Sequence, residues 1–593
     1  MYLEKLEIEN FRSFAKATIP LNENLTVLVG ENNGGKSNVI EAIRLLTPPA
    51  SGRVDRYCEL EDLHRFTDQK SFSIAGRFSG LSAAQQGDLI SLLSDPAATS
   101  AQLKLTCTVE EGVAKRPRFT GGAHDTQPEQ GARERIRHVY LPALRDAQFA
   151  LSSGNPTRKL ALLRHVIPSA DHDAFRGALQ RTGTHAGLGQ VKEAVSKELA
   201  DLTSGVREQA AELGFSENEQ LIDIARDLRF RLGDADGDAS EIALSGLGFA
   251  NLLYMATIIV ELERAQESDL TLFLVEEPEA HLHPHLQMSV LDFLQERAQK
   301  PAETVPGMPA GKIQVIVASH SPNLTSWASS SNLIALRTVQ AGQGKQSKPL
   351  PLSKIDLTPK ERRKIDRYLD VTRAALLFGG RCLLVEGIAE AILLPVIANR
   401  MFEEAIARIK ESEVDEPEKT DRIRAEQIRK KKFRGSTFVP IDGVDFEPYI
   451  KMMLSGSDGV RLADQVILIT DEDAGAGTTR KASYEKLADD LNAADQLEVV
   501  LSADTLEVDL FEAGNAAIMK AAYLKLHERS EVKWDEMAAL ESDAHKARIR
   551  EIFKSTRKGD FAQELAALIE DRAEEHPFAP PEYLTRAIEA ACR

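Results

Sequence analysis

Residues 26–37 read Thr-Val-Leu-Val-Gly-Glu-Asn-Asn-Gly-Gly-Lys-Ser, and they match the pattern G-x-x-x-x-G-K-[ST]. The four fixed positions are Gly30, Gly35, Lys36 and Ser37. An apolar run at 25–29 predicts a buried strand before the loop. After the loop, residues 38–46 predict a helix with one apolar face, formed by Ile40, Ile43 and Leu46. A strand, a glycine-rich loop and a helix in this order are the context that separates a phosphate-binding P-loop from a chance glycine-rich turn.

This loop predicts an ATP site. Glycines allow successive backbone N–H groups to face the phosphates, and the N-terminus of the helix adds partial positive charge. We expect Lys36 to reach the β- and γ-phosphates and the Ser37 hydroxyl to bind Mg²⁺. Asn33 and Asn38 are further candidate contacts of the nucleotide.

The composition limits the class of protein. With 593 residues the chain has room for two to four domains, and its net charge of −18 means that any DNA-binding surface must be a local patch. Its four cysteines form no C-x-x-C pair, which argues against a zinc site and fits a reducing cytoplasm. Residues 242–260 carry no charge, but their glycines and polar residues favour a buried helix over a membrane span. We expect no signal peptide and no membrane segment.

Further motifs follow the P-loop in a fixed order. Residues 244–249 read Leu-Ser-Gly-Leu-Gly-Phe, and the apolar strand 270–275 ends in Glu276 and Glu277. An ATPase places a Mg²⁺-organising carboxylate and a water-polarising base at such a strand end, and we assign these roles to Glu276 and Glu277 respectively. Another apolar strand, 313–318, leads to His320, for which a role at the same sheet edge is favoured over a purely structural one.

These motifs together resemble an ABC-type ATPase head of the RecF/SMC/Rad50-like branch, as does the opening Asn-Phe-Arg-Ser-Phe at 10–14. The resemblance implies two heads that enclose two ATP molecules, with Ser245 and Gly246 on the partner's γ-phosphate and His320 as the switch histidine. Glu276 replaces the usual Walker B aspartate, and no residue is assigned as the Q-loop glutamine. The charged, helical pattern of 155–235 predicts a helical insertion, either a dimerisation arm or a solvated hairpin.

A second α/β unit follows a Gly/Pro/Lys-rich stretch. We predict an ATPase domain at 1–345, a linker and helical connector at 346–378, and a parallel-sheet domain at 379–593. In this last domain one strand ends at Glu386, with Glu390 on the next helix, and another ends at Asp471 and Asp473. Such acids at one sheet edge repel each other unless they bind cations, and their hard oxygen ligands suit Mg²⁺ or Mn²⁺. Two such ions could hold a phosphodiester for in-line attack. Solvated acids at strand ends are the alternative.

The strand Leu-Val-Glu-Gly with Glu390, followed by an Asp-x-Asp strand, resembles the Toprim domain of topoisomerases, primases and some nucleases. An ABC-type head joined to a C-terminal Toprim domain with a Rossmann-like parallel sheet resembles the OLD (overcoming lysogenisation defect) nuclease family, which includes the Gabija A subunit. In that family a further acid and a lysine complete the nuclease centre, and Glu507 and Lys558 match them. The resemblance also implies anti-phage defence, and it leaves open a UvrD-like helicase partner.

The sequence therefore predicts an ATP-binding, metal-dependent DNA endonuclease that works as a homodimer or higher homo-oligomer. Its metals, two ions by the count of acids, would lie on Glu386, Glu390, Asp471, Asp473 and Glu507. Two alternatives stay open. A topoisomerase would need a tyrosine-bearing cleavage module, which is not evident, and an ATP-gated DNA clamp would use the acids only for structure.

Overall fold

The computed structural model describes the chain from Met1 to Arg593 apart from several short segments. The residues that it does not describe are 53, 55, 95–98, 144–150, 152–155, 173, 176–185, 204–208, 215–224, 226–227, 235–239, 242–246, 263–266, 300–308, 342–343, 370–375, 379, 457–459, 473–474, 541 and 574. The chain forms two compact units. Unit 1 comprises residues 1–354 and 369–371, and unit 2 comprises 355–368 and 372–593.

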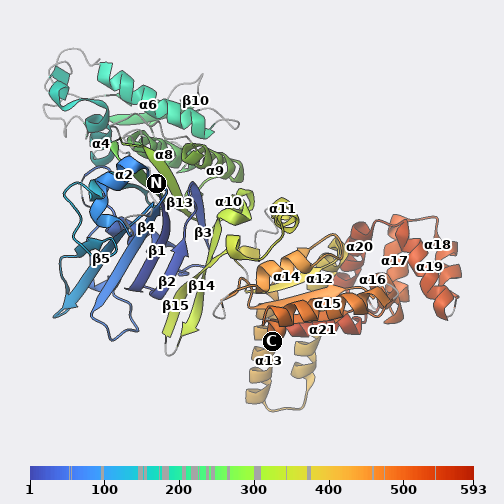
Figure 1. Cartoon of the computed structure of the whole chain (residues 1–593). Coiled ribbons are helices and arrows are strands. Elements are labelled where there is room, and N and C mark those ends of the chain that lie inside the picture. The colour runs from blue at the N-terminus through green and yellow to red at the C-terminus, as the bar shows by residue number, and fades with distance from the viewer. Residues whose placement is uncertain are drawn as a thin grey trace. The chain divides into compact units, whose positions relative to one another are not determined.

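Unit 1 is built on two six-stranded sheets (Figure 1). The first is antiparallel and has the order β2-β1-β4-β5-β6, with β7 also paired to β5; its strands are β1 (Tyr2–Phe11), β2 (Phe14–Pro20), β4 (Ser71–Ser79), β5 (Ser100–Glu110), β6 (Val113–Ala114) and β7 (Arg118–Gly121). The second has the order β15-β14-β3-β13-β12-β8; its strands are β3 (Leu25–Val29), β8 (Ile136–Leu141), β12 (Leu270–Glu276), β13 (Lys312–Ala318), β14 (Leu333–Ala341) and β15 (Gly344–Pro351).

Five of the strands in the second sheet run parallel, and β15 is antiparallel at the edge. All five residues of β3 are buried, as expected for a strand covered on both faces. Helix α1 (Lys36–Leu46) buries Ile40, Ile43 and Leu46 in the core that the two sheets share, which confirms the predicted apolar face. The parallel sheet therefore directs the carboxyl ends of β3, β12 and β13 to one edge.

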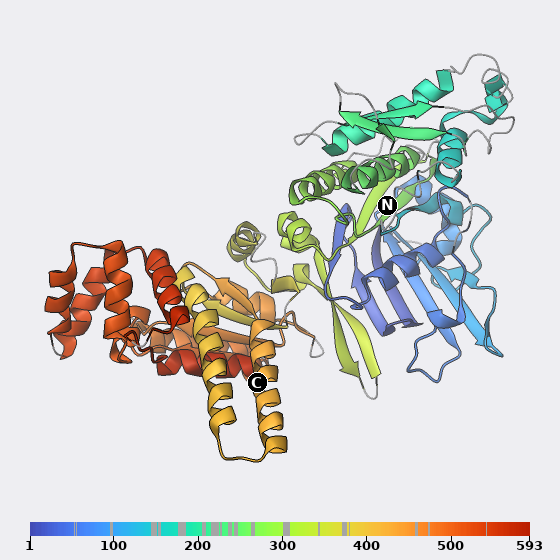
Figure 2. The same cartoon turned by 180° about the vertical axis from the view of Figure 1, so that it is seen from behind.

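The other helices of unit 1 are α2 (Ala83–Asp88), α4 (Thr157–Val166), α6 (Ala186–Thr203), α8 (Leu247–Leu262), α9 (Pro284–Gln299) and α10 (Pro322–Trp327). Both views show α6 layered over α8 and α9 (Figures 1 and 2). The insertion predicted to be helical at 155–235 is mixed. It contains β9 (Gln209–Gly214) and β10 (Arg229–Asp234), which pair antiparallel in a small sheet with β11 (Ser240–Glu241).

Two further predictions concern the stretches at 242–260 and 346–378. Residues 247–262 form the short helix α8, and no helix in the described ranges is long and apolar enough to cross a membrane. The start of the predicted linker is wrong, because residues 344–351 form β15, which pairs with β14 along its whole length. The helical connector is present as α11 (Pro359–Tyr368).

Unit 2 is a four-stranded parallel sheet with helices on both faces. Its order is β17-β16-β18-β19, and its strands are β16 (Arg381–Val385), β17 (Thr437–Pro440), β18 (Gln465–Thr470) and β19 (Leu497–Leu501). Helices α14 (Glu447–Leu454) and α15 (Ala476–Asp490) cover one face, and α12 (Ile388–Glu411) and α21 (Glu582–Cys592) cover the other (Figures 1 and 2). The remaining helices are α13 (Glu416–Arg434), which pairs with α12, and α16 (Leu506–Glu512), α17 (Ala516–Leu526), α18 (Glu531–Ala538), α19 (Ser542–Lys554) and α20 (Lys558–Asp571).

Candidate functional sites

The P-loop connects the buried strand β3 to α1 through residues with left-handed backbone. Gly30 has φ 138° and Gly35 has φ 102°, and Asn33 also lies at positive φ. A Cβ on Gly30 would lie 2.4 Å from the carbonyl oxygen of Leu336, and one on Gly35 would lie 2.7 Å from Ser347 Oγ. Both positions therefore need glycine, for conformation and for space. The loop leads directly into the N-terminus of α1, where a phosphate could be held.

Lys36 closes this loop on itself. Its Nζ donates to the carbonyl oxygens of Gly30 and Glu31, both at 2.8 Å, and the residue is almost fully buried. Burial lowers the pKa of Lys36 to about 8, although Glu277, Glu279 and Glu31 oppose that shift. The ammonium group is thus held by two neutral oxygens, which the more strongly attracting oxygens of a phosphate could replace.

The opening stretch at 10–14 lies against the P-loop helix. Asn38 Nδ2 donates to Ser13 Oγ at 2.7 Å, and Asn38 Oδ1 accepts from Arg12. Ser347 on β15 donates to the same Ser13 hydroxyl at 2.8 Å. The side-chain amide of Asn38 therefore joins the P-loop helix to both sheets, while Ser37 beside it is exposed.

Glu276 ends β12 and is mostly buried. Its Oε2 accepts from the Tyr140 hydroxyl at 2.8 Å, while Oε1 is buried with no hydrogen-bond partner in the described part of the chain. Burial, and then the carboxylate of Glu276, raise the pKa of Tyr140, so this phenol stays a donor. A buried acceptor without a partner suits a cation-bound water, in keeping with the metal-organising role predicted for Glu276.

His320 and Glu277 face each other at this sheet edge. The His320 Nε2 lies 3.7 Å from Glu277 Oε1, and Glu277 itself has φ 44°. Burial and the charge of Lys36 lower the pKa of His320, and Glu277 opposes them. The structure therefore places three predicted residues, Lys36, Glu277 and His320, within electrostatic range of one another.

Glu279 is a residue that the sequence reasoning missed. Its Oε1 accepts three hydrogen bonds, from Ser319 Oγ at 2.8 Å and from the backbone N–H groups of His320 at 2.7 Å and Ser321 at 3.1 Å. Burial raises the pKa of Glu279 despite these donors. Glu279 fixes the backbone that carries His320. The sequence signal that could have identified Glu279 is its place in the acidic run 276–279. Its hydrogen-bond partners lie about forty residues further along the chain, so the local sequence does not show its role. Ser245 and Gly246, predicted to contact a partner's γ-phosphate, lie outside the described residues.

In unit 2 the acids gather at the carboxyl edge of neighbouring parallel strands. Val385 and Ile469 are register partners on β16 and β18, so Glu386 and, one residue further along its strand, Asp471 follow the strands at the same edge of the sheet. Glu386 Oε1 accepts from the backbone N–H of Asp471 at 2.8 Å and from the Thr470 hydroxyl. Asp471 Oδ1 accepts from Ser502 Oγ, which follows β19, at 3.1 Å. The predicted strand-end placement of these two acids is present in the structure.

Glu390 and Glu507 complete a cluster of carboxylates with mutual repulsion. Glu390 sits in the first turn of α12, where its Oε2 accepts from the Gly387 N–H at 3.2 Å. Burial raises the pKa of Glu390, and the charges of Glu507 and Glu386 raise it further. Burial likewise raises the pKa of Asp471 well above 3.8, with Glu386, Glu390 and Glu507 adding to the shift. The four side chains thus form one electrostatic group.

Among the described residues, two cations contact this cluster. Lys558 Nζ lies 2.9 Å from Glu507 Oε1, so the structure brings together the lysine and the acid that the resemblance paired. Burial lowers the pKa of Lys558, but the attraction of Glu507, Asp471 and Glu390 outweighs it and raises the pKa overall. Arg480, which sequence reasoning missed, lies 3.6 Å from Glu386 Oε1 and donates to the Thr470 hydroxyl at 3.2 Å and to the Asp471 carbonyl. It projects from the first turns of α15, directly after the acidic loop.

The fit of a divalent cation to this cluster rests on its donor set and charge. All four acids offer hard oxygen ligands, and their mutual repulsion is what a bound cation relieves. As the side chains stand, no group of three or more Asp, Glu, His or Cys residues in the described ranges is arranged to hold a metal ion. Asp473, the fifth predicted ligand, lies outside those ranges. Binding would therefore require side-chain movement.

Comparison with known proteins finds an ATPase family and a nuclease relative. A family described as an AAA ATPase domain matches residues 1–112 and 179–325. An OLD nuclease from Thermus scotoductus is 25% identical over 448 residues, which cover 67% of this chain and 74% of the relative. The expected resemblance to the OLD nuclease family is confirmed.

Other similar proteins match a smaller share of this chain. The DNA replication and repair protein RecF of Rhizobium rhizogenes is 26% identical over 171 residues, which cover 29% of this chain and 40% of RecF. Among solved structures, an SMC head bound to the C-terminal winged-helix domain of ScpA covers 60% of this chain and 99% of its own, at 16% identity and a TM-score of 0.41. The SMC head domain from Thermotoga maritima gives a TM-score of 0.31 at 16% identity.

Proposed function

We propose that this protein is an ATP-hydrolysing, divalent-metal-dependent DNA endonuclease whose cleavage is controlled by its ATPase unit. The observation that carries the proposal is the cluster of Glu386, Glu390, Asp471 and Glu507 on one edge of a parallel sheet, with Lys558 in contact with Glu507. The similarity to an OLD nuclease over both units supports it.

The acidic cluster would hold Mg²⁺ or Mn²⁺, two ions by the number of carboxylates, with Asp473 as a further ligand. The ions would activate water and neutralise charge on the scissile phosphate. Arg480 orients Glu386 and Asp471 through its contacts with both residues. Lys558, which is half-exposed beside Glu507, would stabilise negative charge on the phosphate or the leaving oxygen.

In the ATPase unit, Lys36 and the P-loop backbone would bind the phosphates of ATP, Ser37 and Glu276 would organise Mg²⁺, and Glu277 would polarise the attacking water. Closure of two heads on ATP would bring in Ser245 and Gly246 of the opposite copy. A homodimer, anti-phage defence and a UvrD-like helicase partner belong to the same proposal, and they rest on the family resemblance alone.

Plasmid cleavage tests the proposal. Wild type, Glu386→Ala and Lys36→Ala are incubated with supercoiled plasmid in Mg²⁺ or Mn²⁺, each with and without ATP. We expect the wild type to cut and Glu386→Ala to be inactive, with the Lys36→Ala lanes showing whether nucleotide drives or restrains cleavage. Glu403→Ala is the matched control, because Glu403 lies on α12 outside the acidic cluster. No cutting of any DNA form by the wild type, together with ATP-dependent DNA binding, would favour a DNA clamp instead.

A further inference from the structure

A large cavity in unit 1 is lined by arginines. It has a volume of about 1340 Å³ and lies among the segment after α1, the β6–β7 region, and residues 127–137. Its lining includes six arginines: Arg44, Arg56, Arg116, Arg118, Arg133 and Arg137. Lys115 adds a seventh cation, and the acids among the described lining residues are Glu129 and Glu134. In a chain with a net charge of −18, this is a local basic surface of the kind that binds an anion.

Some of these arginines belong to the wall of the cavity. Arg44 pairs with Glu41 at 2.5 Å, and Arg56 pairs with Glu41 at 2.6 Å and with Asp62. Arg137 lies 3.8 Å from the carboxylate of Glu267, and it donates to the Glu134 carbonyl oxygen at 3.0 Å. The charge of these side chains is therefore at least partly neutralised within the protein.

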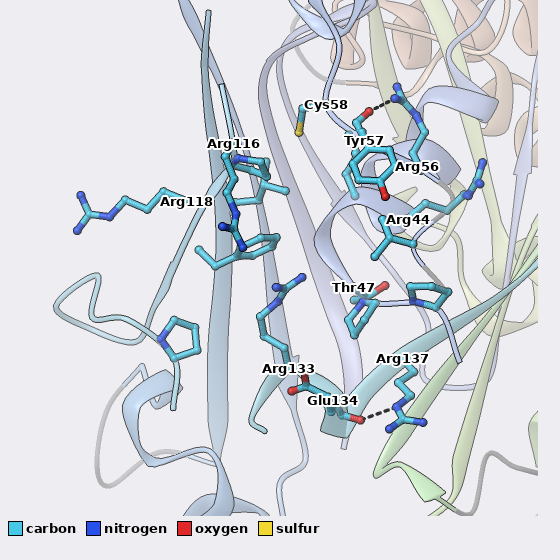
Figure 3. Close-up of a pocket in the computed structure, with 18 of the residues that line it drawn as sticks. Arg44, Thr47, Arg56, Tyr57, Cys58, Arg116, Arg118, Arg133, Glu134 and Arg137 are labelled. Carbon is cyan, nitrogen blue, oxygen red and sulfur yellow. Dashed lines mark hydrogen bonds between the residues drawn. The ribbon is translucent and has the colours of Figure 1, made fainter. Parts of the chain in front are cut away.

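Arg116 and Arg133 differ from them. The guanidinium of Arg133 stacks over the Phe119 ring at 3.4 Å, and its Nε is buried with no hydrogen-bond partner among the described residues. Burial lowers the pKa of Arg133, and Glu134 opposes that shift. Arg116 is exposed, and the described part of the chain gives it no ion pair. Figure 3 shows both side chains projecting into the space between the two walls of the cavity, whereas Arg118 extends away from them.

An exposed aromatic ring completes the surface. Tyr57 is 68% exposed, and Figure 3 shows its ring on the wall opposite Arg116. Its backbone carbonyl accepts from Arg56, which is itself fixed by Glu41 and Asp62, so the position of Tyr57 is well supported. Guanidinium groups beside an exposed ring match the phosphate and the base of a nucleotide.

We propose that this cavity binds a single strand of DNA, with phosphates on Arg116 and Arg133 and a base stacked on Tyr57. The inference rests on the proposed function, because it takes DNA as the substrate. It adds a DNA-binding site in unit 1 that shares no residue with the acidic cluster of unit 2. A free nucleotide carries the same phosphate and base, so the experiment has one arm for each source.

The first arm measures DNA binding by the full-length chain. Fluorescence anisotropy of a labelled oligothymidylate is followed over a salt series in EDTA, in the Glu386→Ala background so that no strand is cut. We expect Arg116→Ala to weaken binding and to reduce the magnitude of the log K against log salt slope by about 0.7, the value for one lost phosphate contact on a single strand. Tyr57→Ala should weaken binding about 5- to 150-fold, and Tyr57→Phe should restore it.

Arg65→Ala is the matched control, since it removes one exposed arginine of the same unit outside the cavity and should change neither value. The second arm measures radiolabelled thymidine monophosphate by equilibrium dialysis in the Lys36→Ala background. If Arg116→Ala weakens binding of thymidine monophosphate but leaves binding of the oligothymidylate unchanged, the cavity binds a free nucleotide and the DNA assignment is overturned.

Unchanged binding of both probes by Arg116→Ala and Tyr57→Ala would overturn the site altogether. Plasmid cleavage by the wild type is read separately, so the two proposals fail independently. A cutting enzyme whose cavity variants bind normally refutes only the cavity. If the wild type never cuts DNA but the cavity variants bind DNA more weakly than the wild type, only the nuclease proposal is refuted.

Discussion

At the scale of single residues, Lys36 is the side chain whose state ATP should change most. Its amine is buried on two carbonyl oxygens with a pKa of about 8. A triphosphate stabilises the charged form, so the pKa must rise on binding. ATP binding at pH 8 should therefore take up protons, and affinity should fall as the pH rises through that value.

Isothermal titration calorimetry at pH 8, in buffers of different ionisation enthalpy, measures this uptake directly. Lys36→Arg keeps a permanent positive charge and should abolish the uptake. An observed enthalpy that is the same in every buffer for the wild type would show that Lys36 is already fully charged in the free protein.

A second residue-scale prediction concerns Glu279. Replacing it with alanine removes the acceptor for the backbone N–H of His320, and a buried donor left without a partner costs about 1–3 kcal/mol. Glu279→Gln keeps an oxygen at the same position, so it should lower the free energy of unfolding by less than Glu279→Ala does. Urea denaturation followed by fluorescence measures both variants. Glu277→Gln is the control, because the Glu277 side chain is 41% exposed and should affect ATP turnover with little change in the free energy of unfolding.

At the scale of secondary-structure elements, the parallel sheet of unit 2 forces carboxylates together, and this should appear as a stability that depends on pH. The folded-state pKa of Asp471 is raised above 3.8, because burial and three neighbouring acids oppose its ionisation. The unfolded chain therefore releases this proton more readily, and metal-free stability should fall as pH rises from about 4 through the folded pKa.

Asp471→Asn removes the charge and keeps the acceptor for Ser502. In EDTA it should raise the melting temperature of unit 2, and by more at pH 8 than at pH 5. Mg²⁺ should stabilise the wild type more than the variant. Differential scanning fluorimetry at the two pH values decides the matter, and an asparagine variant that is less stable at pH 8 would contradict the repulsion argument.

The elements also show what the sequence could and could not predict. Buried strands that end in functional residues were predictable, because the apolar runs 25–29 and 270–275 have the length and composition of parallel strands. Strand β15 was not, since its Gly/Pro/Lys-rich sequence resembles a linker and only pairing with β14 makes it a strand. Likewise, Gln-Ala-Ala-Glu-Leu-Gly at 209–214 favours a helix by composition, yet it pairs with β10.

The same limit applies to the site residues. Glu276, His320, Glu386 and Asp471 stand at strand ends, a place that the sequence pattern marks. Arg480 and Glu279 act through partners distant in sequence, and no local pattern distinguishes them from surface charges. Their roles become visible only in the folded structure, where the paired strands bring these residues next to their partners.

At the scale of the whole molecule, the two units have separate hydrophobic cores. One core draws its residues from positions 3–336 and the other from 383–592. Each core contains large, fully buried side chains, such as Phe11 in the first and Trp534 in the second. Each unit therefore has the core that independent, cooperative unfolding requires.

We expect differential scanning calorimetry to resolve two transitions that respond to different ligands. A ligand that binds only the folded state stabilises it by RT ln(1 + [L]/Kd), about 2.7 kcal/mol at a concentration of 100 Kd. A non-hydrolysable ATP analogue should shift one transition, and Lys36→Ala should abolish that shift. Mn²⁺ alone should shift the other, and Glu386→Ala should abolish that one. If the analogue moves both transitions together in wild type and neither in Lys36→Ala, ATP binding is coupled to unit 2, which is the energetic link that control of cleavage by the ATPase unit requires.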